Sequence, residues 1–160
     1  MQPPSLKARA LQLLARREHG RVELERKLAP HAENAEEIRR VLDELQDKGY
    51  LDDRRFADSW VHRRGARLGP ARLQQELRDK GLTADAIAET LAPLRTLEPE
   101  HARAVWEHRF GRAPQDTAER ARQMRFLAAR GFSAETIRKI VPKTSPRSAE
   151  GSQDGEHDVE

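Results

Sequence analysis

The sequence feature that most constrains the fold of this chain is an internal repeat. An offset of 49 residues relates a first segment to a second: Leu24, Leu28, Ile38 and Leu42 correspond to Leu73, Leu77, Ile87 and Leu91. An offset of 50 relates the second segment to a third: Leu77, Gly81, Ile87 and Leu91 correspond to Leu127, Gly131, Ile137 and Val141. Leucines at helical spacing are common to all helical proteins, but glycines and helix caps at the same offset are not. The repeat therefore predicts similar units packed in a row, each contacting mainly its neighbours.

Each unit is predicted to contain a long helix, a short helix and a third helix. Glycines, prolines and capping residues mark the predicted helix ends: Gly20, Pro30, Asn34, Gly49, Asp52 or Asp53, Gly69-Pro70, Gly81, Thr83, Gly111, Asp116, Gly131, Ser133 and Pro142. Between these ends, apolar residues recur at the spacing of one helical face. The stretch from Pro93 to Pro99 is predicted to be a connector.

The fold class that follows is all-α, with three tandem three-helix repeats forming an elongated curved array. We place the repeats at residues 1–50, 51–95 and 96–143, and we expect a disordered acidic tail at 144–160. Apolar residues make up 36% and aromatic residues 4% of the chain, which is too little apolar mass for one thick core. No segment shows sustained alternation of apolar and polar residues, so no strand is predicted.

The net charge of +3 is unevenly distributed along the chain. Residues 1–143 carry +7 and residues 144–160 carry −4, counting lysine and arginine against aspartate and glutamate. A basic body suggests an anionic partner, either nucleic acid or an acidic protein surface, although arginine-rich helices also occur as solvated faces. The chain has no cysteine and no apolar run long enough to cross a bilayer. We therefore expect a cytoplasmic protein that makes no membrane contact.

No arrangement of residues points to catalysis. The acidic pair Asp52-Asp53 stands at a predicted helix start, where the helix dipole accounts for it. His101 and His108 share a helical face but lack further metal ligands at suitable spacing. No glycine-rich phosphate loop occurs in the sequence. We therefore expect no enzyme activity, no cofactor and no metal site.

Two segments resemble the signature of the RecX regulatory proteins: residues 42–57, LDELQDKGYLDDRRFA, and residues 69–81, GPARLQQELRDKG. Residues 125–133, RFLAARGFS, are similar to the C-terminal repeat of that family. The resemblance extends from Leu6 to about Val141 and includes the three-unit architecture. It implies a protein that binds RecA, the recombinase that coats single-stranded DNA as a helical filament. RecX proteins lie in the filament groove, limit filament growth, and damp ATP hydrolysis, strand exchange and coprotease activity.

The chain departs from the family pattern at two places. Gly20 stands where serine would cap the second helix better, so we expect a slightly weaker helix. The acidic tail is longer than the family needs. We predict that its carboxylates compete with an acidic partner for the basic body.

The signature turn is interpreted as architectural rather than as a binding site. Its residues are Gly49, Tyr50, Leu51, Asp52, Asp53 and Phe56. The apolar pair Tyr50-Leu51 is expected to pack at a helix junction, and one of the two acids is expected to cap the next helix. Trp60 and Trp106 lie in apolar stripes, which favours core packing over stacking on exposed bases.

Two arginine clusters are predicted to form a basic track for a binding partner. The first cluster comprises Arg63, Arg64, Arg67 and Arg72. The second comprises Arg109, Arg112, Arg120, Arg122, Arg125 and Arg130. Guanidinium groups pair with phosphates and carboxylates in bidentate geometry, so the track fits either DNA or an acidic RecA surface. A solvated face remains the alternative for any single member.

The leading hypothesis is a monomeric regulator that binds the RecA filament, inhibits RecA and so regulates DNA repair, homologous recombination and the SOS response. It is expected to bind single- or double-stranded DNA weakly and without sequence preference. An alternative is a helix-turn-helix DNA-binding protein acting in transcription, which three-helix units allow. The absence of an evident dimerisation helix argues against it. A third possibility is a helical scaffold without a nucleic-acid partner.

Overall fold

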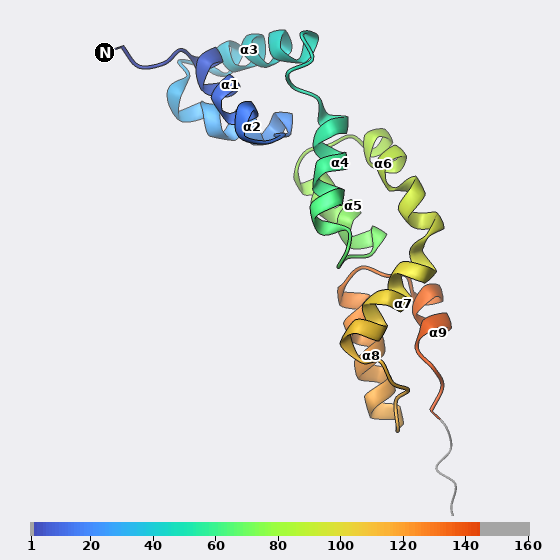
Figure 1. The fold of residues 1–160 in the computed structure, drawn as a ribbon. Coiled ribbons are helices and arrows are strands. Elements are labelled where there is room, and N and C mark those ends of the chain that lie inside the picture. Colours follow the sequence, from blue (N-terminus) through green and yellow to red (C-terminus); the bar gives the residue numbers. More distant parts are fainter. Residues whose placement is uncertain (1, 145–160) are drawn as a thin grey trace, which may run out of the picture.

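The computed structural model describes residues 2–144, and all regular structure within them is helical (Figure 1). The first unit contains α1 (Leu6–Arg16), α2 (Arg21–Leu28), the short 3-10 helix η1 (Ala29–His31) and α3 (Ala35–Asp47). The second contains α4 (Asp53–Arg64), α5 (Pro70–Asp79) and α6 (Ala84–Thr96). The third contains α7 (Glu98–Arg109), α8 (Thr117–Ala129) and α9 (Ala134–Ile140). The predicted fold class, three tandem three-helix units, is confirmed.

Each unit has a small hydrophobic core of its own. Leu24, Leu28 and Leu42 lie at the centre of the first core, and Phe56, Leu73, Leu77 and Leu91 at the centre of the second. Ala102, Trp106, Leu127 and Ile137 belong to the third. Because no single core joins the units, they meet only at narrow joints and form the elongated, curved row seen in Figure 1.

The expectation that Pro93 to Pro99 form a connector between the second and third units is wrong. Helix α6 continues through Pro93 to Thr96, and α7 begins at Glu98, so only Leu97 separates the two helices. The Leu97 amide donates to the Pro93 carbonyl at 3.3 Å, and the His101 amide donates to the Leu97 carbonyl at 3.0 Å. Hydrogen bonding therefore runs through the junction, even though proline supplies no N–H of its own.

The joint between the second and third units brings two helix ends together. The Gly69 amide donates to the Arg130 carbonyl at 2.7 Å, and the Ala71 amide donates to the Gly131 carbonyl at 3.1 Å. The free N–H groups at the start of α5 thus satisfy free carbonyls at the end of α8, with the helix dipoles in favourable alignment. A Cβ atom on Gly69 would lie 2.5 Å from the Gly131 carbonyl, so only glycine permits this approach.

The joint between the first and second units uses the equivalent glycines. A Cβ on Gly81 would lie 2.2 Å from Val22 Cγ2, and one on Gly20 would lie 3.3 Å from the Phe56 ring. The Arg21 amide at the start of α2 donates to Asp53 Oδ1 of the second unit at 3.0 Å. Gly20 is the N-cap of α2 and makes no side-chain capping bond, as expected. Its lack of a side chain lets the units approach, and Asp53 accepts a hydrogen bond that a serine cap would not supply.

Candidate functional site

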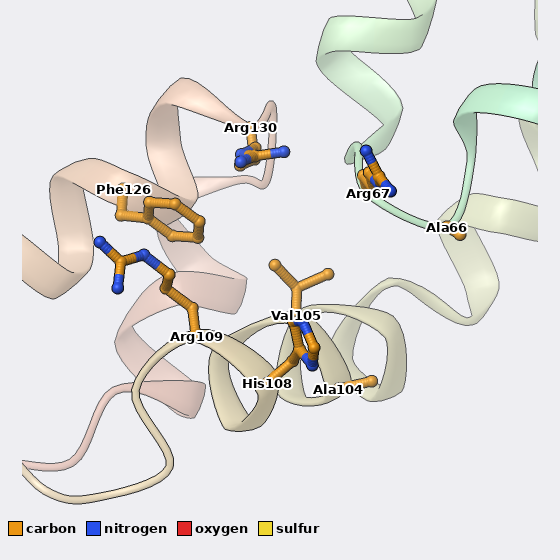
Figure 2. Close-up of a pocket in the computed structure, with 8 residues that line it drawn as sticks. All are labelled: Ala66, Arg67, Ala104, Val105, His108, Arg109, Phe126 and Arg130. Carbon is orange, nitrogen blue, oxygen red and sulfur yellow. The ribbon is translucent and has the colours of Figure 1, made fainter.

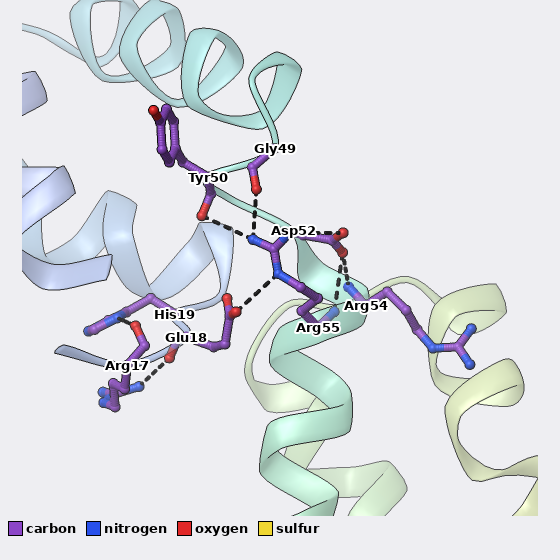
Figure 3. Close-up of polar contacts among 8 residues, drawn as sticks. All are labelled: Arg17, Glu18, His19, Gly49, Tyr50, Asp52, Arg54 and Arg55. Carbon is purple, nitrogen blue, oxygen red and sulfur yellow. Dashed lines mark hydrogen bonds and ion pairs between the residues drawn. The ribbon is translucent and has the colours of Figure 1, made fainter. Parts of the chain in front are cut away.

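The signature turn connects α3 and α4 (Figure 3). Asp52 Oδ1 accepts the amides of Arg54 at 2.8 Å and Arg55 at 3.2 Å, so Asp52 is the cap of α4. Leu51 is 1% exposed and packs in the first core, as expected. Tyr50 is 54% exposed, so the expectation that both members of this apolar pair are packed is wrong for Tyr50.

Arg55 ties the turn to the first unit, a contact that sequence reasoning missed. Its Nη2 donates to the carbonyls of Gly49 at 2.7 Å and Tyr50 at 3.3 Å (Figure 3). Its Nε donates to Glu18 Oε1 at 3.0 Å, beyond the end of α1. These contacts support an architectural role for the turn.

Two of the four arginines in the first predicted cluster share one carboxylate of the second unit. Arg64 and Arg72 both pair with Glu76, whose side chain is 13% exposed. Burial raises the pKa of Glu76, but hydrogen bonds from Arg64 and Trp60 and the charges of both arginines outweigh it. The pKa therefore lies below its ordinary value, and Glu76 is ionised at neutral pH.

Trp60 lies beside Arg63 and Arg64 of the first cluster. Its ring is half-buried rather than fully in the core, and its Nε1 donates to Glu76 Oε2 at 2.9 Å. Arg63 lies 5.4 Å and Lys80 4.9 Å from the ring centroid, within the range of cation–π attraction. Arg63 and Arg67 are exposed and form no ion pair with any residue in 2–144.

The six arginines of the second predicted cluster have no ion-pair partner within residues 2–144. Five of them lie around α8 and the end of α7 with guanidinium groups that no carboxylate compensates: Arg109, Arg112, Arg122, Arg125 and Arg130. Arg120 differs, because its Nε donates to the Pro142 carbonyl at 3.2 Å and holds the end of the third unit. The third unit is therefore the part of the predicted track with the most uncompensated positive charge.

The repeat register explains why the second and third units differ in charge. Glu76 on α5 corresponds to Phe126 on α8, and Lys80 corresponds to Arg130, both at the offset of 50. The carboxylate that pairs with two arginines in the second unit is thus replaced by an aromatic ring in the third. Arg130 lies 4.9 Å from the Phe126 ring centroid and Arg109 lies 5.6 Å from it. Sequence reasoning missed Phe126, although comparing the two repeats position by position would have revealed it.

A cavity of about 390 Å³ lies where the two clusters meet, between the second and third units (Figure 2). Its lining residues are Ala66, Arg67, Ala104, Val105, His108, Arg109, Phe126 and Arg130. Figure 2 shows Arg67 on the α4–α5 loop, across the cavity from Phe126 of α8 and from Arg130 just after the end of α8. The structure thus brings together one arginine of the first cluster and two of the second.

Comparisons with known proteins match each unit to a separate family description. These are RecX, first three-helix domain, at residues 7–45; second, at 52–91; and third, at 97–141. The Regulatory protein RecX of Ralstonia nicotianae is 55% identical over 140 residues, covering 88% of each chain. The chain belongs to the RecX family. The Regulatory protein RecX of Ralstonia pickettii is 54% identical over 140 residues, with the same coverage.

Solved RecX structures share the fold. A crystal structure of RecX from Lactobacillus salivarius superposes with a TM-score of 0.72 at 22% identity, covering 84% of this chain and 91% of that one. Another, titled regulatory protein RecX, gives a TM-score of 0.73 and covers 84% of this chain and 70% of that one. This RecX-family chain places no group of three potential metal ligands together within residues 2–144. No helix in that range is long and apolar enough to span a membrane.

Proposed function

We propose that this RecX-family chain binds the RecA filament on single-stranded DNA and inhibits RecA ATP hydrolysis, strand exchange and coprotease activity. It would thereby regulate DNA repair and recombination as a binding protein rather than as an enzyme. The observation that carries the proposal is the 55% identity to a Regulatory protein RecX over 88% of both chains. We further propose that it acts as a cytoplasmic monomer and binds single- or double-stranded DNA weakly, without sequence preference.

The structure supports this proposal through shape and charge. A narrow row of three units offers a long surface, which suits the groove of a filament better than a compact body would (Figure 1). The uncompensated arginines of the third unit supply donors for phosphates or for carboxylates of RecA. Arg122 and Arg125 are the exposed members on α8, so we propose them as the centre of the contact.

The test measures ATP hydrolysis by RecA on single-stranded DNA with substoichiometric amounts of this protein. We expect slower hydrolysis and shorter filaments by electron microscopy, and an unchanged rate and filament length would refute the proposal. Replacing Arg122 and Arg125 by glutamate should weaken inhibition. The matched control is the same change at Arg26 and Arg40, exposed arginines of the first unit without ion pairs in residues 2–144.

The alternative function, a helix-turn-helix protein acting in transcription, predicts a different result. It requires tight binding to duplex DNA with a strong preference for one sequence. Weak binding that falls with salt and does not depend on sequence would exclude it. The predicted disordered acidic tail at 144–160 and its role fall, beyond Thr144, on residues outside the described part of the chain.

A further inference from the structure

The cavity between the second and third units places uncompensated arginines beside an aromatic wall, and the proposed function gives no role to this combination. It is lined by three arginines and His108, and none of its lining residues is acidic. Arg67, Arg109 and Arg130 form no ion pair within residues 2–144. Like charges held together in this way repel one another, so an anion in the cavity would relieve a cost that the free protein bears.

The wall of the cavity is apolar and aromatic as well as basic. Val105 of α7 and Phe126 of α8 face it between the arginines (Figure 2). Phe110 packs edge-on against Phe126, with ring centroids 5.3 Å apart and planes at 85°, which holds the Phe126 ring in place. Arg109 and Arg130 lie against the same ring and present planar guanidinium groups beside it. Planar cations and a fixed aromatic ring are the surfaces on which nucleic-acid bases stack.

The size of the cavity restricts the ligand further. Small-molecule sites span about 300–1,000 Å³, and a volume of about 390 Å³ lies near the lower end of that range. Such a space suits one base with its sugar and phosphate. A free acidic side chain would use the arginines but leave the aromatic wall without a partner.

We propose that this cavity binds one nucleotide of a single-stranded nucleic acid, with its phosphate between Arg67 and Arg130 and its base beside Phe126. The proposed nucleotide site rests on the proposed function only in assuming that the protein acts where single-stranded DNA is present. Because Arg67 belongs to the second unit and Arg130 to the third, the bound phosphate bridges the joint. Occupation therefore also fixes the two units relative to one another.

The test compares binding of two fluorescent strands of equal length, oligo(dT) and an abasic strand with the same phosphates. Phe126→Leu keeps apolar bulk but removes the ring, so it should weaken oligo(dT) binding about five-fold and leave abasic binding unchanged. Arg67→Ala should weaken both strands and lower the salt slope by about 1. The matched control is Arg138→Ala, an exposed arginine of α9 outside the cavity and without an ion pair in residues 2–144.

Folding is checked by circular dichroism, and Phe126→Tyr, which keeps the ring, should bind oligo(dT) like the parent protein. Equal binding of the two strands by the parent protein would overturn the inference, and so would equal losses in Arg67→Ala and Arg138→Ala. Displacement of oligo(dT) by poly-glutamate with no effect of Phe126→Leu would instead indicate an acidic protein partner. If free thymidine monophosphate displaces oligo(dT) at the same concentrations at which oligo(dT) itself binds, the cavity holds a free mononucleotide rather than a strand, and the inference is overturned.

The outcomes separate this inference from the proposed function. If the protein inhibits RecA but Phe126→Leu leaves oligo(dT) binding unchanged, the nucleotide site is refuted and the RecA proposal stands. If oligo(dT) binding depends on Phe126 while RecA hydrolysis and filament length are unaffected, the site stands and the RecA proposal fails.

Discussion

Gly69→Ala tests whether the glycine joint holds the second and third units together. The φ of Gly69 is −81°, which alanine adopts without strain, so any effect must come from the added Cβ. That atom would lie 2.5 Å from the Gly131 carbonyl, whereas ordinary contacts begin at 3.4 Å, so the helix ends must separate by about 0.9 Å.

This separation breaks hydrogen bonds. The Gly69 N···Arg130 O distance of 2.7 Å would become about 3.6 Å, which is beyond hydrogen-bond range. The Ala71 N···Gly131 O bond of 3.1 Å would be lost as well. At about 1 kcal/mol per bond, the joint should lose about 2 kcal/mol.

Urea unfolding and amide hydrogen exchange measure the effect. We expect a lower urea midpoint and much faster exchange at the Ala71 amide, with unchanged exchange in the core of the first unit. Gly49→Ala is the matched control, because a Cβ there meets nothing within 4 Å and costs only the backbone strain of a positive φ, about 1–2 kcal/mol. If the Ala71 amide of Gly69→Ala exchanges as slowly as that of the parent protein, the reasoning that this glycine holds the two units together is refuted.

Three further predictions concern individual side chains. The folded-state pKa of Glu76 is lowered, so its ionisation stabilises the protein above the unfolded pKa, and this contribution is lost as pH falls through the folded pKa. Glu76→Gln should therefore flatten the acid side of a thermal-stability profile. Two lysines hydrogen-bond to Glu44 and lower its pKa to about 2, so carbon-detected NMR should find it ionised at pH values where other glutamates are protonated, and Lys7→Ala should raise its pKa. Trp106→Phe removes the 2.9 Å bond from Nε1 to the buried Gln123 and should lower the free energy of unfolding by about 1–3 kcal/mol.

The repeat was readable from the sequence because it depends on local signals. Leucines at helical spacing, glycine stops and polar caps each act within one helix, and many of them recur at offsets of 49 and 50 residues. Asp116 and Ser133 cap α8 and α9 through their own side chains, as their positions predicted. Prediction failed at Pro93, where the rule that proline ends a helix yields to continued hydrogen bonding on the far side of the junction.

The candidate site was less predictable because it depends on contacts between units. The arginines could be grouped by sequence, but not sorted into those that pair with Glu76 and those that form no ion pair within residues 2–144. That distinction requires knowing that α4 and α5 place Arg64 beside Glu76. Phe126 was not singled out by the sequence analysis, and only its correspondence with Glu76 at the offset of 50 sets it apart.

The glycine joints are not repeated on the outer sides of the first and third units within residues 2–144. A joint needs a glycine at the start of one short helix and a positive-φ glycine after the next, as in Gly69 with Gly131. The first unit has Ala32 at the position of Gly81, with a φ of −96°, so it cannot receive a preceding unit in this way. In the third unit, α8 begins earlier and is capped by Asp116, whose Oδ1 accepts the Glu119 amide at 2.7 Å. Within the described part of the chain, neither outer unit offers the complementary half of such a joint, so this contact would not join one copy of the chain to another.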